Sequence, residues 1–209
     1  MGLPVEVPGL DTIIPQVGEG RIVVVESGAD EAKSFFVRRL ARTALGLTWP
    51  VTFLTSRDGS ELSHALLNGG AATPSSARNL QVTERDSLRG WEGLERLRGF
   101  LAIDSFSFLT LDLPPDQLSE MLRRLRAAAH ATGLMVVLAT DRGMFDPRSE
   151  AIVAHLADGF VQFHAKEGTE GLIRFLRIPK WTEGTFVDRN IYYEYDGKRL
   201  AIDLRKRVL

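Results

Sequence analysis

The chain has 209 residues, which suits one domain of the larger kind, and its 44% hydrophobic and 25% charged residues are typical of a globular protein rather than a disordered one. Its 26 basic residues are balanced by 27 acidic ones, so the net charge of -1 creates no global basic field that would attract nucleic acid or an anionic membrane. The absence of cysteine excludes disulfides, thiolate metal sites and cysteine nucleophiles.

Neither the apolar segments nor the N-terminus indicates a membrane or a secretory route. The longest apolar runs are far shorter than the roughly 20 residues that a bilayer-spanning helix needs. The first residues also lack the basic start and the long apolar stretch of a signal peptide. We therefore expect a soluble, cytoplasmic protein that binds neither a membrane nor DNA.

Apolar runs and helical patterns alternate over the first 165 residues. Residues 21–26 form a continuous β-branched run, which is typical of a strand buried on both faces. The helical spacing of apolar residues over 33–45 predicts a helix, and the composition of residues 68–79 predicts a loop. We further expect strands at 51–55, 80–83, 100–104, 134–140 and 159–164, and helices at 58–67 (N-capped by Asp58 or Ser60), 88–97, 114–131 and 149–156.

The pattern changes after residue 165. Segments 172–178, 191–195 and 199–204 alternate like antiparallel strands, and Asp196-Gly197 between the last two is a strong hairpin signal. The sequence therefore predicts a single α/β domain over residues 1–209. It has a mostly parallel core over 1–165 and an antiparallel, β-rich extension over 166–209.

The loop between the first strand and the first helix has the layout of a phosphate-binding loop. The motif G-x-x-x-x-G-K-[ST] corresponds here to residues 27–34, in which Lys33 and Ser34 are retained. Ser27 and Ala32 replace the two defining glycines. Lys33 is the only lysine in the first 165 residues, and it stands where a compact cation would meet phosphate. The alternative is a solvated lysine at the start of a helix.

A second motif fits the same chemistry. Phe100–Asp104 is a run of four apolar residues that ends in aspartate, as in a Walker B strand, whose carboxylate holds the water shell of magnesium. The alternative is an aspartate that caps the end of a strand. We expect Asp104 and the loop that contains Lys33 to lie at the carboxyl ends of adjacent parallel strands.

In their order and spacing these segments resemble the RecA superfamily, and most closely the KaiC-like proteins common in archaea. The resemblance covers nearly the whole chain. It is carried by residues 7–14, 19–27, Phe100–Ser105, 156–163 and 173–180. The resemblance implies a RecA-like three-layer fold, ATP and magnesium at the carboxyl edge of the sheet, and ring assembly with the nucleotide between subunits.

The resemblance also implies roles for particular residues. The nucleotide would contact Gly28, Lys33, Ser34, Asp104 and Lys180, and magnesium would be held by Ser34 and Asp104. Other positions depart from the family. Where the family places catalytic carboxylates this chain has Ser56 and Arg57, with Asp58 and Glu61 as displaced candidates for the base; Thr182 stands where the family has an arginine.

The loop itself opposes an anion, because Asp30 and Glu31 lie inside it. Each carboxylate would repel a phosphate a few ångströms away, and Asp30 is also suited to capping the helix, so that the protein's own side chain fills the site. We therefore expect nucleotide binding to be weak or absent and hydrolysis weaker still.

The sequence leaves several functions open. We favour a KaiC/RecA-like ATPase homologue with an eroded nucleotide site, acting in regulation, signalling or scaffolding with itself or with an active paralogue. The alternatives are an active ATPase that uses Lys33, Ser34 and Asp104, and a recombinase-type accessory protein of DNA repair. Asp141-Arg142 lies at the sheet edge where relatives sense the γ-phosphate or bind DNA, or forms a capped surface turn. The apolar residues of 105–116 form core or a subunit contact.

Overall fold

The computed structural model describes residues 2–28, 32–68, 74–168, 171–182 and 187–203. The strands are β1 (Leu3–Pro4), β2 (Gln16–Val17), β3 (Ile22–Ser27), β4 (Val51–Thr55), β5 (Leu80–Glu84), β6 (Phe100–Ile103), β7 (Met135–Asp141), β8 (Gly159–Gly168), β9 (Gly171–Trp181), β10 (Val187–Tyr195) and β11 (Leu200–Ile202). The helices are α1 (Ala32–Gly46), α2 (Gly59–Leu67), α3 (Pro74–Asn79), α4 (Phe106–Leu109), α5 (Pro115–Thr132), α6 (Pro147–Leu156) and the 3-10 helix η1 (Leu94–Arg96).

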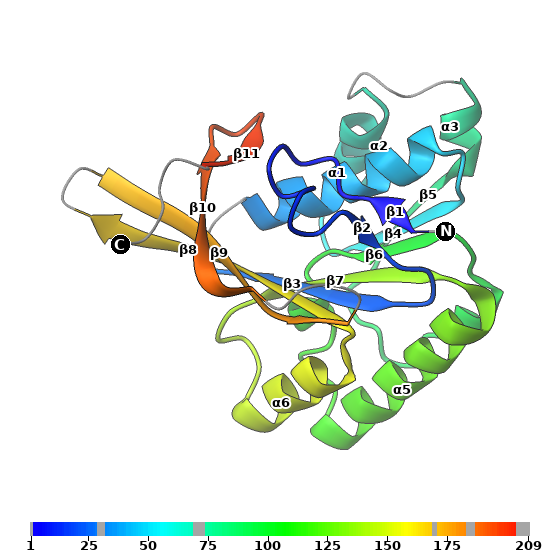
Figure 1. The fold of residues 1–209 in the computed structure, drawn as a ribbon. Helices are drawn as coiled ribbons and strands as arrows, with labels where there is room; N and C mark the ends of the chain where they lie inside the picture. The colour runs from blue at the N-terminus through cyan, green and yellow to red at the C-terminus, as the bar shows by residue number, and fades with distance from the viewer. Residues whose placement is uncertain (1, 29–31, 69–73, 169–170, 183–186, 204–209) are drawn as a thin grey trace.

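A large sheet forms the middle layer of the protein. Across the described residues its nine strands follow the order β11-β10-β9-β8-β3-β7-β6-β4-β5. Figure 1 shows α1 and α2 on one face of this sheet and α5 and α6 on the other. The mixed α/β architecture expected from the sequence is confirmed, with parallel strands from β8 to β5 and antiparallel pairs from β8 to β11.

Strand β3 is covered on both faces, which explains its unbroken β-branched sequence. Val23 and Val25 pack into the core on the α1 side of the sheet, whereas Ile22 and Val24 pack into the core on the side of α5 and α6. All four are at most 3% exposed. Because successive strand residues point to opposite faces, a strand buried on both sides shows no polar alternation.

The antiparallel extension contains the hairpin that its sequence predicts. Strands β10 and β11 pair around Asp196-Gly197, and Gly197 has a φ of 88° that a residue with a Cβ rarely adopts. Asp196 Oδ1 accepts hydrogen bonds from the backbone N–H groups of Lys198 and Arg199 at 2.8 and 2.7 Å. The predicted hairpin is therefore confirmed.

One prediction about the sheet is wrong. Strands β3 and β6, which precede the two candidate nucleotide motifs, are not neighbours, because β7 lies between them and pairs in parallel with both. Each strand-helix-strand connection returns the chain to the sheet, but the order of motifs along the chain does not fix the order of the strands. The residues at the end of β7 therefore lie between the two motifs.

Two local predictions also fail. The helix expected at 88–97 is reduced to η1, because Gly90 and Gly93 take positive φ values of 66° and 87° that interrupt a helix. The loop expected at 68–79 contains α3 in its second part, while residues 69–73 lie outside the described residues. No helix in the described part of the chain is both long and apolar enough to cross a membrane.

Candidate functional site

Lys33 lies in the first turn of α1 and is directed at the end of β7. Its side chain is buried, with 4% of its surface exposed. The ammonium Nζ donates a hydrogen bond to the backbone oxygen of Thr140 at 3.0 Å and lies 2.5 Å from Asp141 Oδ1. The cation that the sequence offers to a phosphate is thus already paired with a carboxylate, and the alternative of a solvated lysine is wrong.

Asp141 is held in place by a second partner. Its backbone N–H donates to Ser107 Oγ at 3.0 Å, and the same hydroxyl lies 3.3 Å from Asp141 Oδ2. Ser107 belongs to α4, which follows Asp104 in the chain, and is itself fully buried. Both oxygens of the Asp141 carboxylate therefore have partners, one from α1 and one from α4.

The next residue, Arg142, contacts Glu26 and Ser27 at the end of β3. We call the ends of β3 and β7, with these contacts, the corner. Its backbone N–H donates to Ser27 O at 2.8 Å, and its Nε donates to Glu26 Oε1 at 3.0 Å. Glu26 is 7% exposed and also accepts a hydrogen bond from Gln162. Arg142 further lies 3.1 Å from His164 Nδ1 and donates to Phe163 O at 3.2 Å. Arg142 therefore lies in a turn at the surface, as one alternative expected, and its side chain is anchored there to Glu26.

His164 is half-buried beside Arg142. Burial first, and then the charges of Arg142 and Arg177, lower the pKa of His164 to about 4. The imidazole is therefore neutral at physiological pH. It stacks on Phe175, with ring centroids 4.8 Å apart and 3° between the planes.

Asp104 fits the role of a magnesium carboxylate better than Lys33 fits that of a phosphate cation. It follows β6 directly, is 5% exposed, and its backbone N–H donates to Leu54 O at 2.8 Å. Within the described residues its Oδ1 is buried without a hydrogen-bond partner, as is Oγ1 of Thr140. A buried carboxylate oxygen without a donor is costly, and a hydrated cation would satisfy it.

Ser34 and Gly28 are the other nucleotide candidates at this edge of the sheet. Ser34 lies beside Lys33 in the first turn of α1 and is 5% exposed. Gly28 follows β3 and is exposed, while Asp30 and Glu31 lie outside the described residues. Ser34 and Asp104 are the residues that would hold magnesium, which would neutralise phosphate charge when bound. No group of three or more histidine or acidic side chains suited to a metal occurs among the residues with described positions.

The two candidates for a catalytic base, Asp58 and Glu61, lie at the start of α2. Asp58 caps α2, where its Oδ1 accepts from the backbone N–H groups of Ser60 and Glu61 at 2.8 and 3.3 Å, as the sequence predicted. The hydrogen bond from the Ser60 hydroxyl, and then those backbone bonds, lower the pKa of Asp58. Glu61 is exposed in the first turn of α2. A carboxylate whose pKa is lowered is a poorer proton acceptor than an ordinary one.

Lys180 lies far from this corner in the fold. It pairs with Phe160 near the start of β8, which is the opposite edge of the sheet from the end of β7. Its ammonium donates to the backbone oxygens of Ala154 and His155 at 3.2 and 3.0 Å, at the carboxyl end of α6. Within one chain, the structure does not bring Lys180 together with Lys33.

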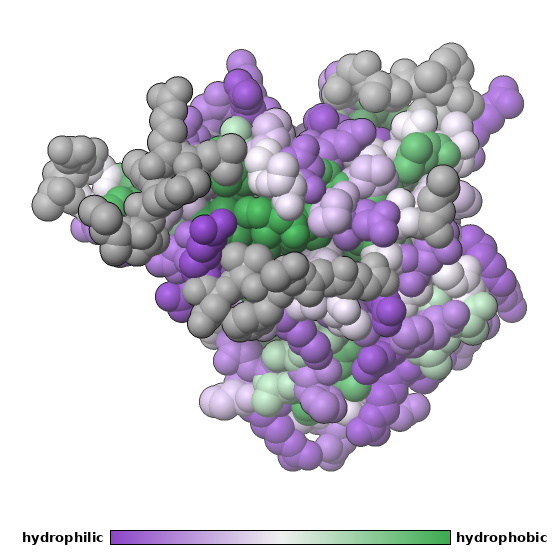
Figure 2. Space-filling view, in the orientation of Figure 1, coloured by the Kyte–Doolittle hydropathy of each residue, from purple (hydrophilic) through white to green (hydrophobic). Residues whose placement is uncertain are grey.

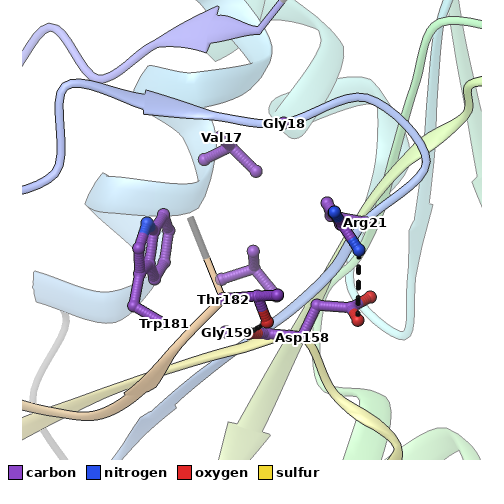
Figure 3. A pocket seen from close by; sticks show the side chains of 8 residues that line it. Val17, Gly18, Arg21, Asp158, Gly159, Trp181 and Thr182 are labelled. Atoms are coloured by element: carbon purple, nitrogen blue, oxygen red, sulfur yellow. Dashed lines mark hydrogen bonds and ion pairs between the residues drawn. The ribbon is translucent and has the colours of Figure 1, made fainter. Parts of the chain in front are cut away.

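Asp158 organises a small pocket at that opposite edge (Figure 3). It accepts a hydrogen bond from the backbone N–H of Ile22 at 3.0 Å and pairs with Arg126 and Arg21 at 3.2 and 3.8 Å. Thr182 donates its hydroxyl to the Asp158 backbone oxygen. The cavity measures about 10 Å³, which is room for one water. This cluster joins β3, β8 and α5 and is structural.

Sequence comparisons return no match for this chain, either to a protein-family model or to a curated protein. Solved structures do match. A KaiC-like protein from the hyperthermophilic archaeon Pyrococcus horikoshii superposes with a TM-score of 0.76 at 18% identity, over 97% of this chain and 99% of the other. The chain has a RecA-like, KaiC-type fold. The flagellar accessory protein FlaH of Methanocaldococcus jannaschii matches with a TM-score of 0.75 at 15% identity, over 97% and 98% of the two chains.

The KaiC-type fold confirms the architecture inferred from the sequence resemblance. The sequence did not predict that Asp141 pairs with Lys33. The sequence placed Asp141-Arg142 at the correct edge of the sheet, but 108 positions separate Lys33 from Asp141. Only the position of β7 between β3 and β6 would have indicated that the two side chains meet.

Proposed function

We propose that this chain is a KaiC/RecA-like ATPase homologue with an eroded nucleotide site, which hydrolyses ATP weakly or not at all and acts in regulation, signalling or scaffolding. The observation that carries the proposal is the pairing of the buried Lys33 ammonium with Asp141 at 2.5 Å. A phosphate-loop lysine works by offering its charge to the β- and γ-phosphates. Here a resident anion already takes that charge.

The candidate bases support the same proposal. Hydrolysis needs a group that positions or deprotonates the attacking water, and removal of such a group costs orders of magnitude in rate. Asp58 is used to cap α2, and its lowered pKa opposes proton acceptance. Thr182, at the position where the sequence resemblance implies an arginine, donates its hydroxyl to the backbone of Asp158.

The surface supports a role in assembly with a second copy or an active paralogue. Figure 2 shows a largely hydrophilic face with a hydrophobic area near its centre, in the region of α1 and β10. In the described residues, Phe108 and Leu111 are 48% and 54% exposed, although their neighbours Phe106 and Leu109 are fully buried. The segment that follows Asp104 is therefore partly core and partly available to a protein partner.

One observation favours the alternative of an active ATPase. The unpartnered Asp104 Oδ1 is the kind of group that a magnesium-nucleotide complex would satisfy. Phosphate release from millimolar Mg-ATP separates the two functions when wild type is compared with Lys33→Met. We expect the same background rate from both. Steady turnover by the wild type that Lys33→Met abolishes would establish the active enzyme and refute the eroded site.

A further inference from the structure

The carboxylate of Asp141 lies where a terminal phosphate oxygen would contact the lysine. In phosphate loops the lysine reaches the β- and γ-phosphates. In this chain that lysine contacts Asp141 Oδ1 at 2.5 Å, and β7 brings the carboxylate between the end of β3 and the end of β6. Across the sheet, the end of β7 with Asp141 therefore lies between the end of β3 and the end of β6, which is followed by Asp104, the carboxylate suited to magnesium.

We propose that Asp141 is a specificity-determining residue that substitutes for the terminal phosphate, so that the site selects a nucleoside diphosphate over a nucleoside triphosphate. The inference rests on the proposed function, because it describes what an eroded KaiC-type site still accepts. A triphosphate would bring a further anionic group against Asp141 and Asp104. Like charges a few ångströms apart repel, and among the described residues Lys33 is the lysine that contacts Asp141 and would offset them. A diphosphate ends before it reaches that position.

The fold holds Asp141 in this position through its own contacts with Ser107 and through those of its neighbour Arg142. Ser107 accepts from its N–H and contacts its Oδ2. Arg142, the next residue, is fixed to Glu26 and to the backbone of Ser27. A carboxylate on a free surface side chain would rotate away from an arriving phosphate. This one is anchored through its own backbone and through its neighbour, so displacing it breaks several contacts at once.

The test compares the affinities of two ligands by calorimetry, namely Mg-ADP and the magnesium complex of β,γ-imido-ATP, which is not cleaved. Wild type is measured beside Asp141→Asn and Asp141→Ser, both of which remove the charge and keep a hydrogen-bonding group beside Lys33. Glu95→Gln is the matched control, since it removes one negative charge from a side chain that is 66% exposed on η1, before β6, at the other edge of the sheet.

We expect wild type and Glu95→Gln to bind the diphosphate at least about tenfold more tightly than the triphosphate analogue, a difference of about 1.4 kcal/mol. Either Asp141 variant should reduce that ratio about tenfold or more. Wild type that binds neither ligand would overturn the proposal, even if a variant binds the analogue. Equal affinity of wild type for both ligands, an unchanged ratio in both variants, or no binding by any form would overturn it. Wild type that does not hydrolyse ATP yet prefers the triphosphate refutes this inference alone and leaves the proposed function intact.

Discussion

The guanidinium Nε of Arg142 lies 3.0 Å from Glu26 Oε1, immediately before the loop that leads to Lys33. Asp141, the preceding residue, pairs with Lys33 at the other end of that loop. Two consecutive residues at the end of β7 therefore bind both ends of the segment that would cradle a phosphate in a KaiC-type site. Charged, part-buried contacts therefore hold the described residues on the two sides of positions 29–31.

Substitutions of Lys33 and Asp141 should have coupled effects on the free energy of unfolding. Asp141→Leu leaves the Lys33 ammonium buried without its counter-ion, and we expect the free energy of unfolding to fall by about 3 kcal/mol. Lys33→Met combined with Asp141→Leu should recover most of that loss, since neither charge remains. Urea unfolding of the single and double variants gives the coupling. Additive effects of the two changes would show that the pair is not an energetic unit.

Asp104 should lower the stability of the metal-free protein. Its buried Oδ1 lacks a donor among the described residues, and Asp104→Asn replaces this carboxylate by a neutral amide. We expect the variant to unfold at higher urea in the presence of EDTA, with a gain of about 1 kcal/mol. A loss of stability of similar size would mean that the carboxylate has a stabilising partner, and would remove the argument for a cation beside it.

His164 should titrate far below an ordinary histidine. Its pKa of about 4, against 6.5 in the unfolded chain, means that the unfolded state binds the proton more readily between these values. Stability is therefore complete above about pH 6.5 and decreases as the pH falls towards 4. An NMR titration of His164 should place its midpoint near 4, and His164→Gln should flatten the pH dependence over that window. A midpoint near 6.5 would show that the corner around Arg142 is open to water.

Asp58 should behave as a helix cap and not as a base. Asp58→Ala removes the acceptor for the first N–H groups of α2, so we expect the melting temperature to fall by a few degrees. Because its folded pKa is lowered, its contribution is present above the unfolded pKa and is lost as the pH falls through the folded value. Glu61→Gln, one turn along and exposed, should change the melting temperature by much less. Asp58→Ala that abolishes ATP turnover without lowering stability would identify a base instead.

The sequence predicted most of the fold because local patterns specify local structure. The β-branched run of β3, the helical spacing of α1 and the Asp-Gly turn before β11 each depend on residues within a few positions. The expected helix at 88–97 failed for the same kind of reason, since its two glycines outweighed the apolar spacing.

The site could be predicted only in part. The motifs indicated Lys33, Ser34 and Asp104 as candidates, and all three lie at the ends or starts of the expected elements. The partner of Lys33 was not found, because it depends on the insertion of β7 between β3 and β6, a property of the whole sheet. The sequence suggested that an acidic residue of the loop itself, Asp30, would fill the site. The carboxylate that the structure describes beside Lys33 is Asp141, at the end of β7.

A crystal structure of the wild-type chain grown with millimolar Mg-ATP tests the central claim most directly. We predict that Lys33 Nζ remains bound to Asp141 and to the backbone oxygen of Thr140, with no terminal phosphate beside it. An ordered triphosphate whose outer oxygens contact Lys33, with the Asp141 carboxylate displaced from the ammonium, would contradict the account.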